Sequence, residues 1–303
     1  MDRLQSMRVF LKVAELGSFA RAATLLDISN AAVTRFVADL EDHLGARLLH
    51  RSTRKLSLTD IGQTYLKRVR QILPEIEDAE ACASSRSKQP SGTLKLFCQM
   101  SFGQYQLPRL LPAYAKLFPD VMQDITLSDR AIDLVEEGFD VAIFYRSQKF
   151  DSNMIVRQLG VTEIILCASP DYIAQHGLPL VPEDLTKHIC LSYAYENLRD
   201  SWPLRGPDDE EVVIPITNKM VSNNSDMLNH CGHAGMGIVL RPTFSLGDDL
   251  KSGRLVRVLP NYHVRKFALK LVYPSRRLLS ATVRSFVDFM VEQFPKPKTD
   301  PWA

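Results

Sequence analysis

The chain of 303 residues has few of the features that mark secreted or membrane proteins. Its five cysteines are an odd number with no CxxC spacing, which argues against a disulfide framework and indicates reduced thiols. No run reaches the ~18 uncharged apolar residues that a membrane span needs, and the first residues lack the apolar run of a signal peptide. We therefore expect a cytoplasmic protein of two or three domains.

Signature motifs of common enzymes are also missing, since no GxSxG, GxGxxG, Walker or HExxH pattern occurs. His230-Cys231-Gly232-His233 crowds three possible zinc ligands onto one short predicted helix, but no partner cluster lies elsewhere. Asp129 and Asp133 could form a carboxylate pair, although Asp133 is more simply a surface residue of a helix. We expect no catalytic residues, no metal site and no cofactor.

A strong excess of one charge is missing from the whole chain, whose net charge is +2, yet the charge is unevenly distributed. Residues 1–70 contain twelve Lys and Arg against seven Asp and Glu, whereas acidic residues are in the majority in the remainder. A basic N-terminal part on a slightly acidic body is typical of a protein that binds nucleic acid at one end only.

The stretch from Ser18 to Phe36 predicts two short helices separated by a tight break, a helix-turn-helix. Ser18 and Ser29 are candidate N-caps, because a serine hydroxyl can accept a backbone N–H that has no partner within the helix. Phe36 is expected to face inward. The start of the second helix exposes side chains that suit base edges in a DNA major groove, namely Ser29, Asn30, Ala31, Thr34 and Arg35. The alternative is an ordinary helical hairpin, in which Thr34 only bonds within its own helix.

The flanks of this helix pair favour the DNA-binding interpretation. Residues 47–59 place apolar residues around a basic tip, which predicts a two-stranded wing with Arg51 and Arg54 near phosphates or a minor groove. The long helix that follows has an apolar seam at steps of four and three, which predicts pairing with a second copy: Tyr65, Val69, Ile72, Ile76, Ala79 and Ala83. Pro74 predicts a bend near Leu73.

From residue 93 onward, predicted strands alternate with predicted helices, which indicates a parallel sheet with helices on its faces. Residues 154–159 and 163–168 are predicted as two separate strands. The segment from Pro295 is rich in proline and lysine, so we expect it to be frayed.

Taken together, these motifs resemble the LysR-type transcriptional regulators over nearly the full length. The N-terminal part of the resemblance rests on Met1-Asp2-Arg3-Leu4, Gly17-Ser18-Phe19, Ala22-Ala23, Ala32-Val33-Thr34-Arg35, Leu44-Gly45, Arg47-Leu48-Leu49, Leu58-Thr59 and Gly62. The C-terminal part rests on Ser101-Phe102-Gly103, Leu127-Ser128-Asp129-Arg130, residues 133–143, Leu166-Cys167-Ala168-Ser169-Pro170 and Ala234-Gly235-Met236-Gly237-Ile238.

The resemblance implies an α/β protein overall. It implies an all-α winged helix-turn-helix at residues 1–58, a dimerising linker helix at 59–88, a hinge at 89–92 and an effector domain at 93–303. That domain would resemble type 2 periplasmic binding proteins, with lobe I at 93–162 and 266–294 and lobe II at 163–265. Such proteins form homodimers and commonly tetramers, bind operators in promoter DNA, and respond to a small molecule held between the lobes.

Two predicted helix N-termini in the effector domain, near Ser101 and Asn224, suit an anion because the helix dipole and the first-turn amides favour negative charge; ordinary capping is the alternative. With the resemblance, the candidate effector residues are Gln99, Met100, Ser101, Phe102, Ser128, Phe144, Arg146, Asn223, Asn224 and Ser225.

Several residues of this predicted cleft depart from the common family pattern, among them Phe97, Gln99, Phe144 and Arg241. They favour an anionic effector with an apolar or aromatic body, with Arg146 or Arg241 as its counter-ion. The alternative for both arginines is that they face water. The rival to the whole interpretation is a solute-binding or enzymatic α/β protein with no transcriptional role.

Overall fold

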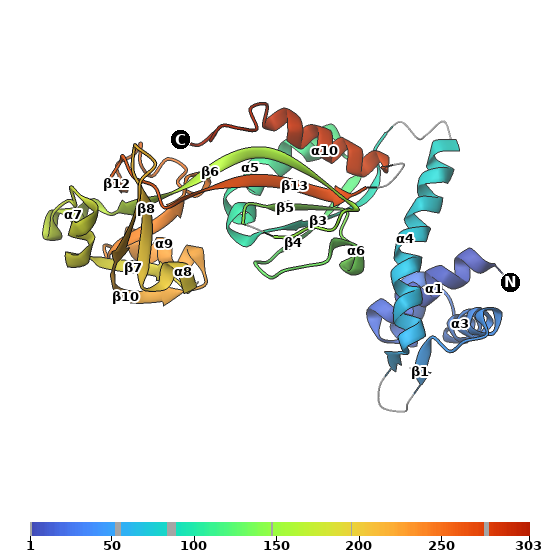
Figure 1. Ribbon diagram of the computed structural model, residues 1–303. Coiled ribbons are helices and arrows are strands. Elements are labelled where there is room, and N and C mark those ends of the chain that lie inside the picture. Colours follow the sequence, from blue (N-terminus) through green and yellow to red (C-terminus); the bar gives the residue numbers. More distant parts are fainter. Residues whose placement is uncertain (1, 52–55, 84–88, 147, 195, 276–278) are drawn as a thin grey trace. The chain divides into compact units, whose positions relative to one another are not determined.

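The computed structural model describes residues 2–51, 56–83, 89–146, 148–194, 196–275 and 279–303 (Figure 1). The chain forms two compact units. The N-terminal unit comprises Met1–Ser91, Ile132–Asp140 and Arg276–Arg284, and the α/β unit comprises Gly92–Ala131, Val141–Ser275 and Ser285–Ala303.

The N-terminal unit contains helices α1 (Arg3–Leu16), α2 (Phe19–Leu26), α3 (Asn30–Leu44) and α4 (Asp60–Ala83), the short helix α6 (Leu134–Glu137), and strands β1 (Leu49–Arg51) and β2 (Leu56–Leu58), which pair antiparallel. The predicted caps form, because the Ser18 hydroxyl accepts from Arg21 N at 3.3 Å and the Ser29 hydroxyl from Ala32 N at 3.1 Å. Gly45 ends α3 with a φ of 63° in the left-handed region, which glycine adopts without steric cost.

Glu41 of α3 is a buried carboxylate, only 2% exposed, at the point where the chain enters the wing. One of its oxygens accepts from Leu48 N at 2.8 Å and Leu49 N at 3.1 Å, and the other pairs with Arg47 Nη1 at 2.8 Å. Burial by itself raises the pKa of Glu41, but the hydrogen bonds from Arg47, Leu48 and Leu49 outweigh it and lower the pKa. This carboxylate therefore fixes the start of the wing to α3.

Helix α4 is continuous through Pro74, and the predicted bend near Leu73 stays a prediction. A proline removes one intrahelical hydrogen bond, but the helix remains continuous through the turns on either side of it. The first half of the predicted seam packs within its own unit: Tyr65 lies 5.7 Å from Phe10 between ring centroids, and Val69 is buried. Ile72, in contrast, is 38% exposed.

The α/β unit is built on one mixed sheet with the strand order β10-β7-β11-β6-β13-β5-β3-β4 and β12 paired to β6. Its strands are β3 (Gly92–Cys98), β4 (Val121–Leu127), β5 (Val141–Phe144), β6 (Met154–Ala168), β7 (Ile189–Tyr193), β10 (Thr217–Ser222), β11 (Ile238–Pro242), β12 (Val256–Val258) and β13 (Arg265–Pro274). The β3–β4, β3–β5, β7–β10 and β7–β11 pairs are parallel, as predicted, but β6 and β13 run antiparallel to their partners.

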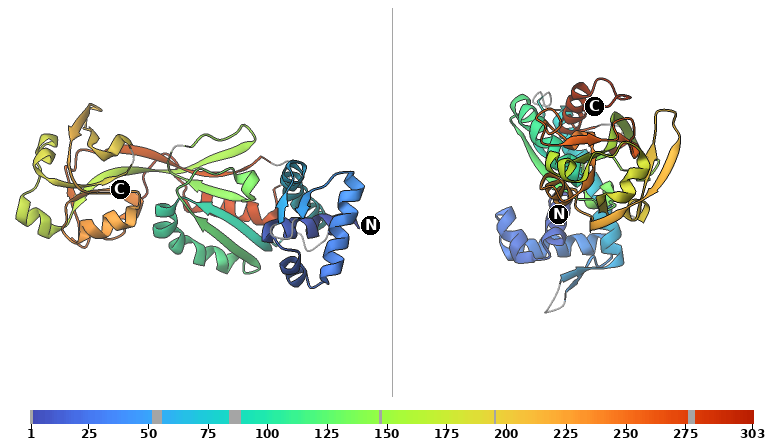
Figure 2. Two further views of the ribbon diagram at one scale, coloured as in Figure 1. Left: turned by 90° about the horizontal axis from the view of Figure 1, so that it is seen from below. Right: turned by 90° about the vertical axis from the view of Figure 1, so that its left-hand side faces the viewer.

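Strands β6 and β13 join two lobes (Figures 1 and 2). We call the first lobe the part around β3, β4 and β5, and the second lobe the part around β7, β10 and β11. The two predicted strands at 154–159 and 163–168 are one strand, β6, because Gly160 and Thr162 pair with β13 without a break in β6. The chain therefore connects the lobes through continuous sheet.

A hairpin of β8 (Ser201–Arg205) and β9 (Glu211–Pro215) in the second lobe was not predicted as two strands. Pro203 inside β8 obscures the strand pattern, since proline cannot donate to a ladder. The hairpin buries Trp202, whose Nε1 donates to Ser192 Oγ at 3.2 Å.

The helices of the α/β unit are α5 (Met100–Leu117), α7 (Pro170–His176), α8 (Glu196–Arg199), α9 (Ser225–His233) and α10 (Ala281–Gln293) from Ser285 onward, with 3₁₀ turns η1 (Pro182–Lys187) and η2 (Thr243–Ser245). Tyr114 of α5 is buried against Phe286 and Phe289 of α10 and shares a hydrogen bond of 2.8 Å with Ser285. This packing fixes α5, whose first turn lines the pocket described below.

Residues 295–303 are ordered against the sheet, so the prediction of a frayed segment is wrong. Val161 N of β6 donates to Thr299 O at 3.0 Å, and Gln158 Nε2 donates to Pro297 O at 2.7 Å. Figures 1 and 2 show the C-terminus beside β6. Composition favoured disorder here, but the backbone is held by bonds that no local pattern reveals.

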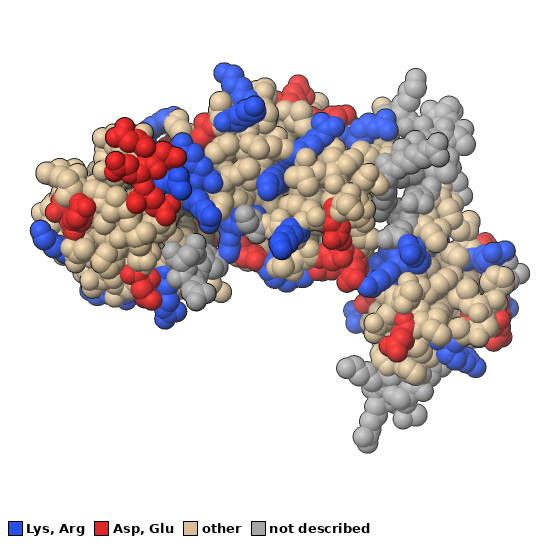
Figure 3. Space-filling model, viewed as in Figure 1, with Lys and Arg blue, Asp and Glu red and all other residues tan. Residues whose placement is uncertain are grey.

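Charged side chains of both signs are interspersed over the face of the α/β unit seen in Figure 3. Within the described parts of the chain, no helix combines the length and the apolar character needed to cross a membrane.

Candidate functional site

The first candidate site is the start of α3. Ser29, Asn30, Ala31 and Arg35 are exposed there, and the buried residues of the helix are Val33, Val37, Leu40 and Glu41. The Thr34 hydroxyl donates to Asn30 O at 2.9 Å, which is the within-helix bond of the alternative interpretation. This bond occupies the hydroxyl hydrogen of Thr34, so its γ-methyl is the group that Thr34 can add to those of the exposed residues.

Phe36, the last residue of the predicted helix-turn-helix, does not share this exposed turn. Its inward position is confirmed only in part, because the residue is half-buried while it packs against the core of the N-terminal unit. The guanidinium carbon of Arg35 lies 5.9 Å from the centroid of the Phe36 ring, within the range of a cation–π contact. Helix α3 also continues past Phe36 to Leu44. Phe36 is therefore a packing residue beside Arg35 and not a group that reads bases.

Two other predicted contacts belong to the wing. Arg51 is the last residue of β1, but its side chain lies outside the described residues, as does all of Arg54. Their roles therefore remain predictions from sequence.

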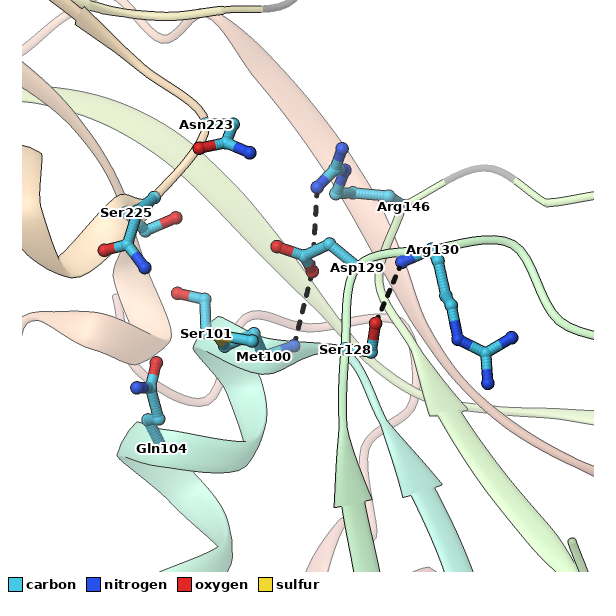
Figure 4. A pocket seen from close by; sticks show the side chains of 10 residues that line it. Met100, Ser101, Gln104, Ser128, Asp129, Arg130, Arg146, Asn223 and Ser225 are labelled. Atoms are coloured by element: carbon cyan, nitrogen blue, oxygen red, sulfur yellow. Dashed lines mark hydrogen bonds and ion pairs between the residues drawn. The ribbon is translucent and has the colours of Figure 1, made fainter.

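The second candidate site is a pocket of about 420 Å³ in the α/β unit, between the first turn of α5 and the start of α9 (Figure 4). This is within the usual size range of small-molecule sites. Seven predicted residues line it: Met100, Ser101, Ser128, Arg146, Asn223, Asn224 and Ser225. Gln104, Asp129 and Arg130 also line it and were not predicted as effector residues.

Asp129 places a negative charge inside this pocket. Its Oδ1 accepts from Met100 N, the first amide of α5, at 3.3 Å and lies 3.7 Å from Arg146 Nη1. The carboxylate thus meets both a helix N-terminus and a guanidinium, the two groups that favour an anion most. The Arg130 side chain points away from Asp129 in Figure 4.

Ser101 provides an uncharged polar group, its side-chain hydroxyl. The residue is 1% exposed, and its hydroxyl oxygen has no hydrogen-bond partner among the described residues. Figure 4 shows this hydroxyl directed toward the side of the pocket where Asn223 and Ser225 lie. A buried hydroxyl without a partner costs about 1–3 kcal/mol, and a ligand that bonds to it would recover that cost.

The start of α9 forms the wall opposite Ser101. Asn224 caps the helix by accepting from Met227 N at 2.9 Å, and Ser222 Oγ accepts from Asn224 N at 3.1 Å. The chain is therefore held in the conformation that directs the first-turn amides and the Asn223 side chain toward the pocket.

Gln99, Phe102 and Phe144 were also predicted at this site, but they do not line the pocket. Gln99 is buried, and its side-chain oxygen accepts from Tyr145 N at 2.8 Å and Arg146 N at 2.9 Å. Phe144 packs against Phe97 in the core, at 5.6 Å between ring centroids. Phe102 is on the buried side of α5. These three residues therefore lie behind the pocket wall. The described residues that line the pocket include no aromatic side chain, contrary to the expectation of a cleft with aromatic residues.

Arg241, predicted as a counter-ion or as facing water, is neither: it is 1% exposed and does not line the pocket. Its Nη1 pairs with Asp249 Oδ2 at 2.8 Å, its Nε donates to Ser245 Oγ at 3.3 Å, and its Nη2 donates to the Ser245 carbonyl. Burial raises the pKa of Asp249, but hydrogen bonds from Arg241 and Arg254 outweigh it and lower the pKa. The cluster is a buried ion pair behind α9.

His233 of the His-Cys-Gly-His segment joins this cluster, since its Nε2 lies 3.0 Å from Asp249 Oδ2. Across the described residues, no group of three or more His, Cys, Asp or Glu is arranged to hold a metal ion. Burial raises the pKa of the Cys167 and Cys190 thiols to about 12, so both stay protonated near neutral pH and are poor nucleophiles.

Comparison with known families and structures agrees with this geometry. Residues 4–63 match the family described as bacterial regulatory helix-turn-helix protein, lysR family, and residues 87–295 match the LysR substrate binding domain. An HTH-type transcriptional repressor of Pseudomonas aeruginosa is 35% identical over 297 residues, covering 97% of this chain and 93% of that protein. The HTH-type transcriptional activator AaeR of Escherichia coli is 30% identical over 294 residues, covering 97% and 94%.

Among solved structures, CrgA, a LysR-type transcriptional regulator from Neisseria meningitidis, is 30% identical with a TM-score of 0.62. The match covers 96% of this chain and 99% of CrgA.

Proposed function

Since the chain belongs to the LysR family of DNA-binding transcriptional regulators, we propose that it binds a promoter operator through α3 and the wing, and that a small anionic metabolite in the α5–α9 pocket controls this binding. It is a regulator and not an enzyme. The observation that carries the effector part is the buried Ser101 hydroxyl, which has no partner among the described residues and lies beside two helix N-termini.

The DNA part of the proposal is supported by the exposed first turn of α3. Base edges in the major groove are read by amide, guanidinium and methyl groups, which Asn30, Arg35 and Ala31 present from one turn. Arg51 and Arg54 would add phosphate or minor-groove contacts, which position the protein without reading sequence.

Arg35→Ala is expected to weaken operator binding by roughly 1–3 kcal/mol, or about 5- to 150-fold, if Arg35 contacts a base. Fluorescence anisotropy with the DNA upstream of the protein's own gene, measured over a salt series, checks this. The matched control is Arg284→Ala, which removes the same charge from an exposed position of α10. Equal affinity of Arg35→Ala and wild type would remove Arg35 from the base-reading set.

The effector part needs one refinement, because Asp129 already meets the N-terminus of α5. An anionic group of the effector would therefore sit on the other side, between the Ser101 hydroxyl and the first turn of α9, with Asn223 beside it. Arg146 would supply the nearest positive charge. The polar lining favours a small, polar effector over one with a large aromatic body.

Ser101→Ala is expected to leave the stability of the free protein unchanged or slightly higher, because it removes a buried polar atom with no partner among the described residues. It should weaken binding of the anionic effector roughly tenfold or more, since a hydrogen bond to a charged group contributes about 1.5–3 kcal/mol. A thermal-shift screen of anionic, cationic and neutral metabolites, followed by titration of the best ligand, measures both effects.

The control for that titration is Ser252→Ala, which removes the hydroxyl of an exposed serine of the second lobe outside the pocket, together with its weak bond of 3.4 Å to Asp249 O. If only cations or neutral sugars stabilise the wild-type protein, the effector is not anionic. If an anion binds but Ser101→Ala binds it equally well, the effector is anionic and the assigned position is wrong.

We also propose that the protein acts in the cytoplasm as a homodimer through α4, and as a tetramer built from such dimers. The exposed Ile72 on α4 supports pairing with a second copy, because helices of this length gain most of their stability from packing.

A further inference from the structure

Residues 295–303 form a structured segment at the end of the chain. The match to the LysR substrate binding domain ends at residue 295. The residues after it are nevertheless ordered on the sheet, with Thr299 O accepting from Val161 N in the middle of β6. The described residues that line the pocket all lie outside this segment, so its role is a separate question.

Trp302 is the residue through which the segment contacts the first lobe. Its Nε1 donates to Gln106 Oε1 of α5 at 3.1 Å, and its ring centroid lies 6.1 Å from that of Phe102 in an edge-to-face arrangement. Phe294 packs on Trp302 at 5.8 Å. Phe102 directly follows Ser101, so Trp302 supports the back of the same helical turn whose front lines the pocket.

The same segment contacts the second lobe and its connection. Trp302 lies 5.9 Å from Phe244 of η2 between ring centroids. Asp300 Oδ2 accepts from Thr243 Oγ1 at 2.6 Å and from Glu163 N of β6 at 3.1 Å, and its Oδ1 accepts from Trp302 N at 2.9 Å. One short stretch of chain is thus bonded to α5 on one side and to η2 on the other.

Trp302 and Asp300 also complete a junction that the two lobes make directly. Gln106 Nε2 donates to the Phe244 carbonyl, and the Phe102 and Phe244 rings meet edge-to-face at 5.3 Å. Edge-to-face aromatic pairs add to the stability gained from burial alone. The indole covers both partners of this pair at once, so a relative movement of α5 and η2 would have to disrupt its contacts.

We propose that residues 297–302 are a strap that holds the two lobes of the α/β unit in one relative arrangement, with Trp302 as the positioning residue that ties the pocket wall on α5 to the second lobe. Lobe movement about connecting strands is a common way for two-lobed binding domains to respond to ligands. The strap would set the relative arrangement of the two lobes when no ligand is bound. This inference goes beyond the proposed function, because it does not depend on which effector binds.

Hydrogen–deuterium exchange of the full-length protein, without ligand, tests the strap. Trp302→Ala and Asp300→Ala should each exchange on the order of tenfold faster at residues 100–106 of the first lobe and at 243–246 of the second. Trp302→Phe keeps an aromatic ring and should restore most of the protection. Lys298→Ala, an exposed position in the same segment, is the matched control and should behave as wild type.

The strap is overturned if faster exchange is confined to residues 295–303, or if it affects only one lobe. Should Trp302→Ala fail to fold, Asp300→Ala decides alone, because it removes the bonds to Thr243 and Glu163 from a partly exposed position. Failure here would leave the DNA and effector proposals untouched, since those are read from operator affinity and ligand titration.

Discussion

Glu41→Ala is expected to lower the free energy of unfolding of the N-terminal unit by about 3 kcal/mol, because two buried backbone N–H groups would each lose their acceptor at a cost of about 1–3 kcal/mol. Without the carboxylate, the buried backbone N–H groups of Leu48 and Leu49 lose their acceptor, and Arg47 loses its ion pair. Glu41→Gln should lose less, because the amide oxygen can still accept from the two N–H groups.

The pH dependence of Glu41 has a definite sign. The pKa of Glu41 in the folded protein lies below the ordinary value of 4.5. The carboxylate therefore contributes its full stabilisation above about pH 4.5 and loses it as the pH falls through the lower folded pKa. Urea unfolding followed by far-UV circular dichroism, at neutral pH and at a series of values below 4.5, measures both effects.

The matched control is Asp42→Ala, which removes the next carboxylate along α3 from an exposed position. It should change stability by less than about 0.5 kcal/mol, as substitutions on an exposed surface usually do. A loss as large as that of Glu41→Ala would show that general charge on α3, and not the buried bonds, sets the stability of this unit.

Arg241→Ala is expected to destabilise the second lobe by roughly 3 kcal/mol, because it removes the buried donor of Asp249 Oδ2 and of the Ser245 carbonyl, while Arg254 still pairs with Asp249 Oδ1. Arg254 provides an internal control, since it pairs with the same carboxylate at 2.8 Å from a side chain that is 60% exposed. Arg254→Ala should cost less than about 1 kcal/mol, in line with exposed ion pairs.

Thermal unfolding of the two variants beside wild type makes the comparison. Nearly equal, small losses would mean that Arg241 is replaceable in the buried cluster. Equal, large losses would mean that the Asp249 carboxylate, and not burial of Arg241, dominates. Because Arg241 does not line the pocket, any change in ligand affinity of Arg241→Ala should follow its loss of stability.

Local patterns predicted the N-terminal unit well, because its signals act within a few residues. The hydroxyls of Ser18 and Ser29 cap the helices that they precede, and Gly45 ends the helix it follows. The burial of Glu41 and its bonds to the wing were not predicted, since a carboxylate on a helix is usually exposed. Its partners lie six to eight residues further on, across a turn, where helical periodicity gives no information.

The pocket was predicted less completely, for a related physical reason. The helix N-termini can be recognised from sequence, and Ser101 and Asn224 lie at the pocket wall. Side-chain direction cannot be recognised in the same way: Gln99 turns inward to bind the backbone of Tyr145, and Arg241 pairs with Asp249. Both interactions join residues that are close only after the sheet has formed.

The positions of the tryptophans have an optical consequence. The chain has two, Trp202 in the core of the second lobe and Trp302 at the junction of the lobes, and both belong to the α/β unit. Tryptophan emission therefore reports on that unit alone, whereas circular dichroism records the helices of both units. Glu41→Ala should shift the dichroism transition while the emission transition stays in place, so the two units can be followed separately in one unlabelled sample.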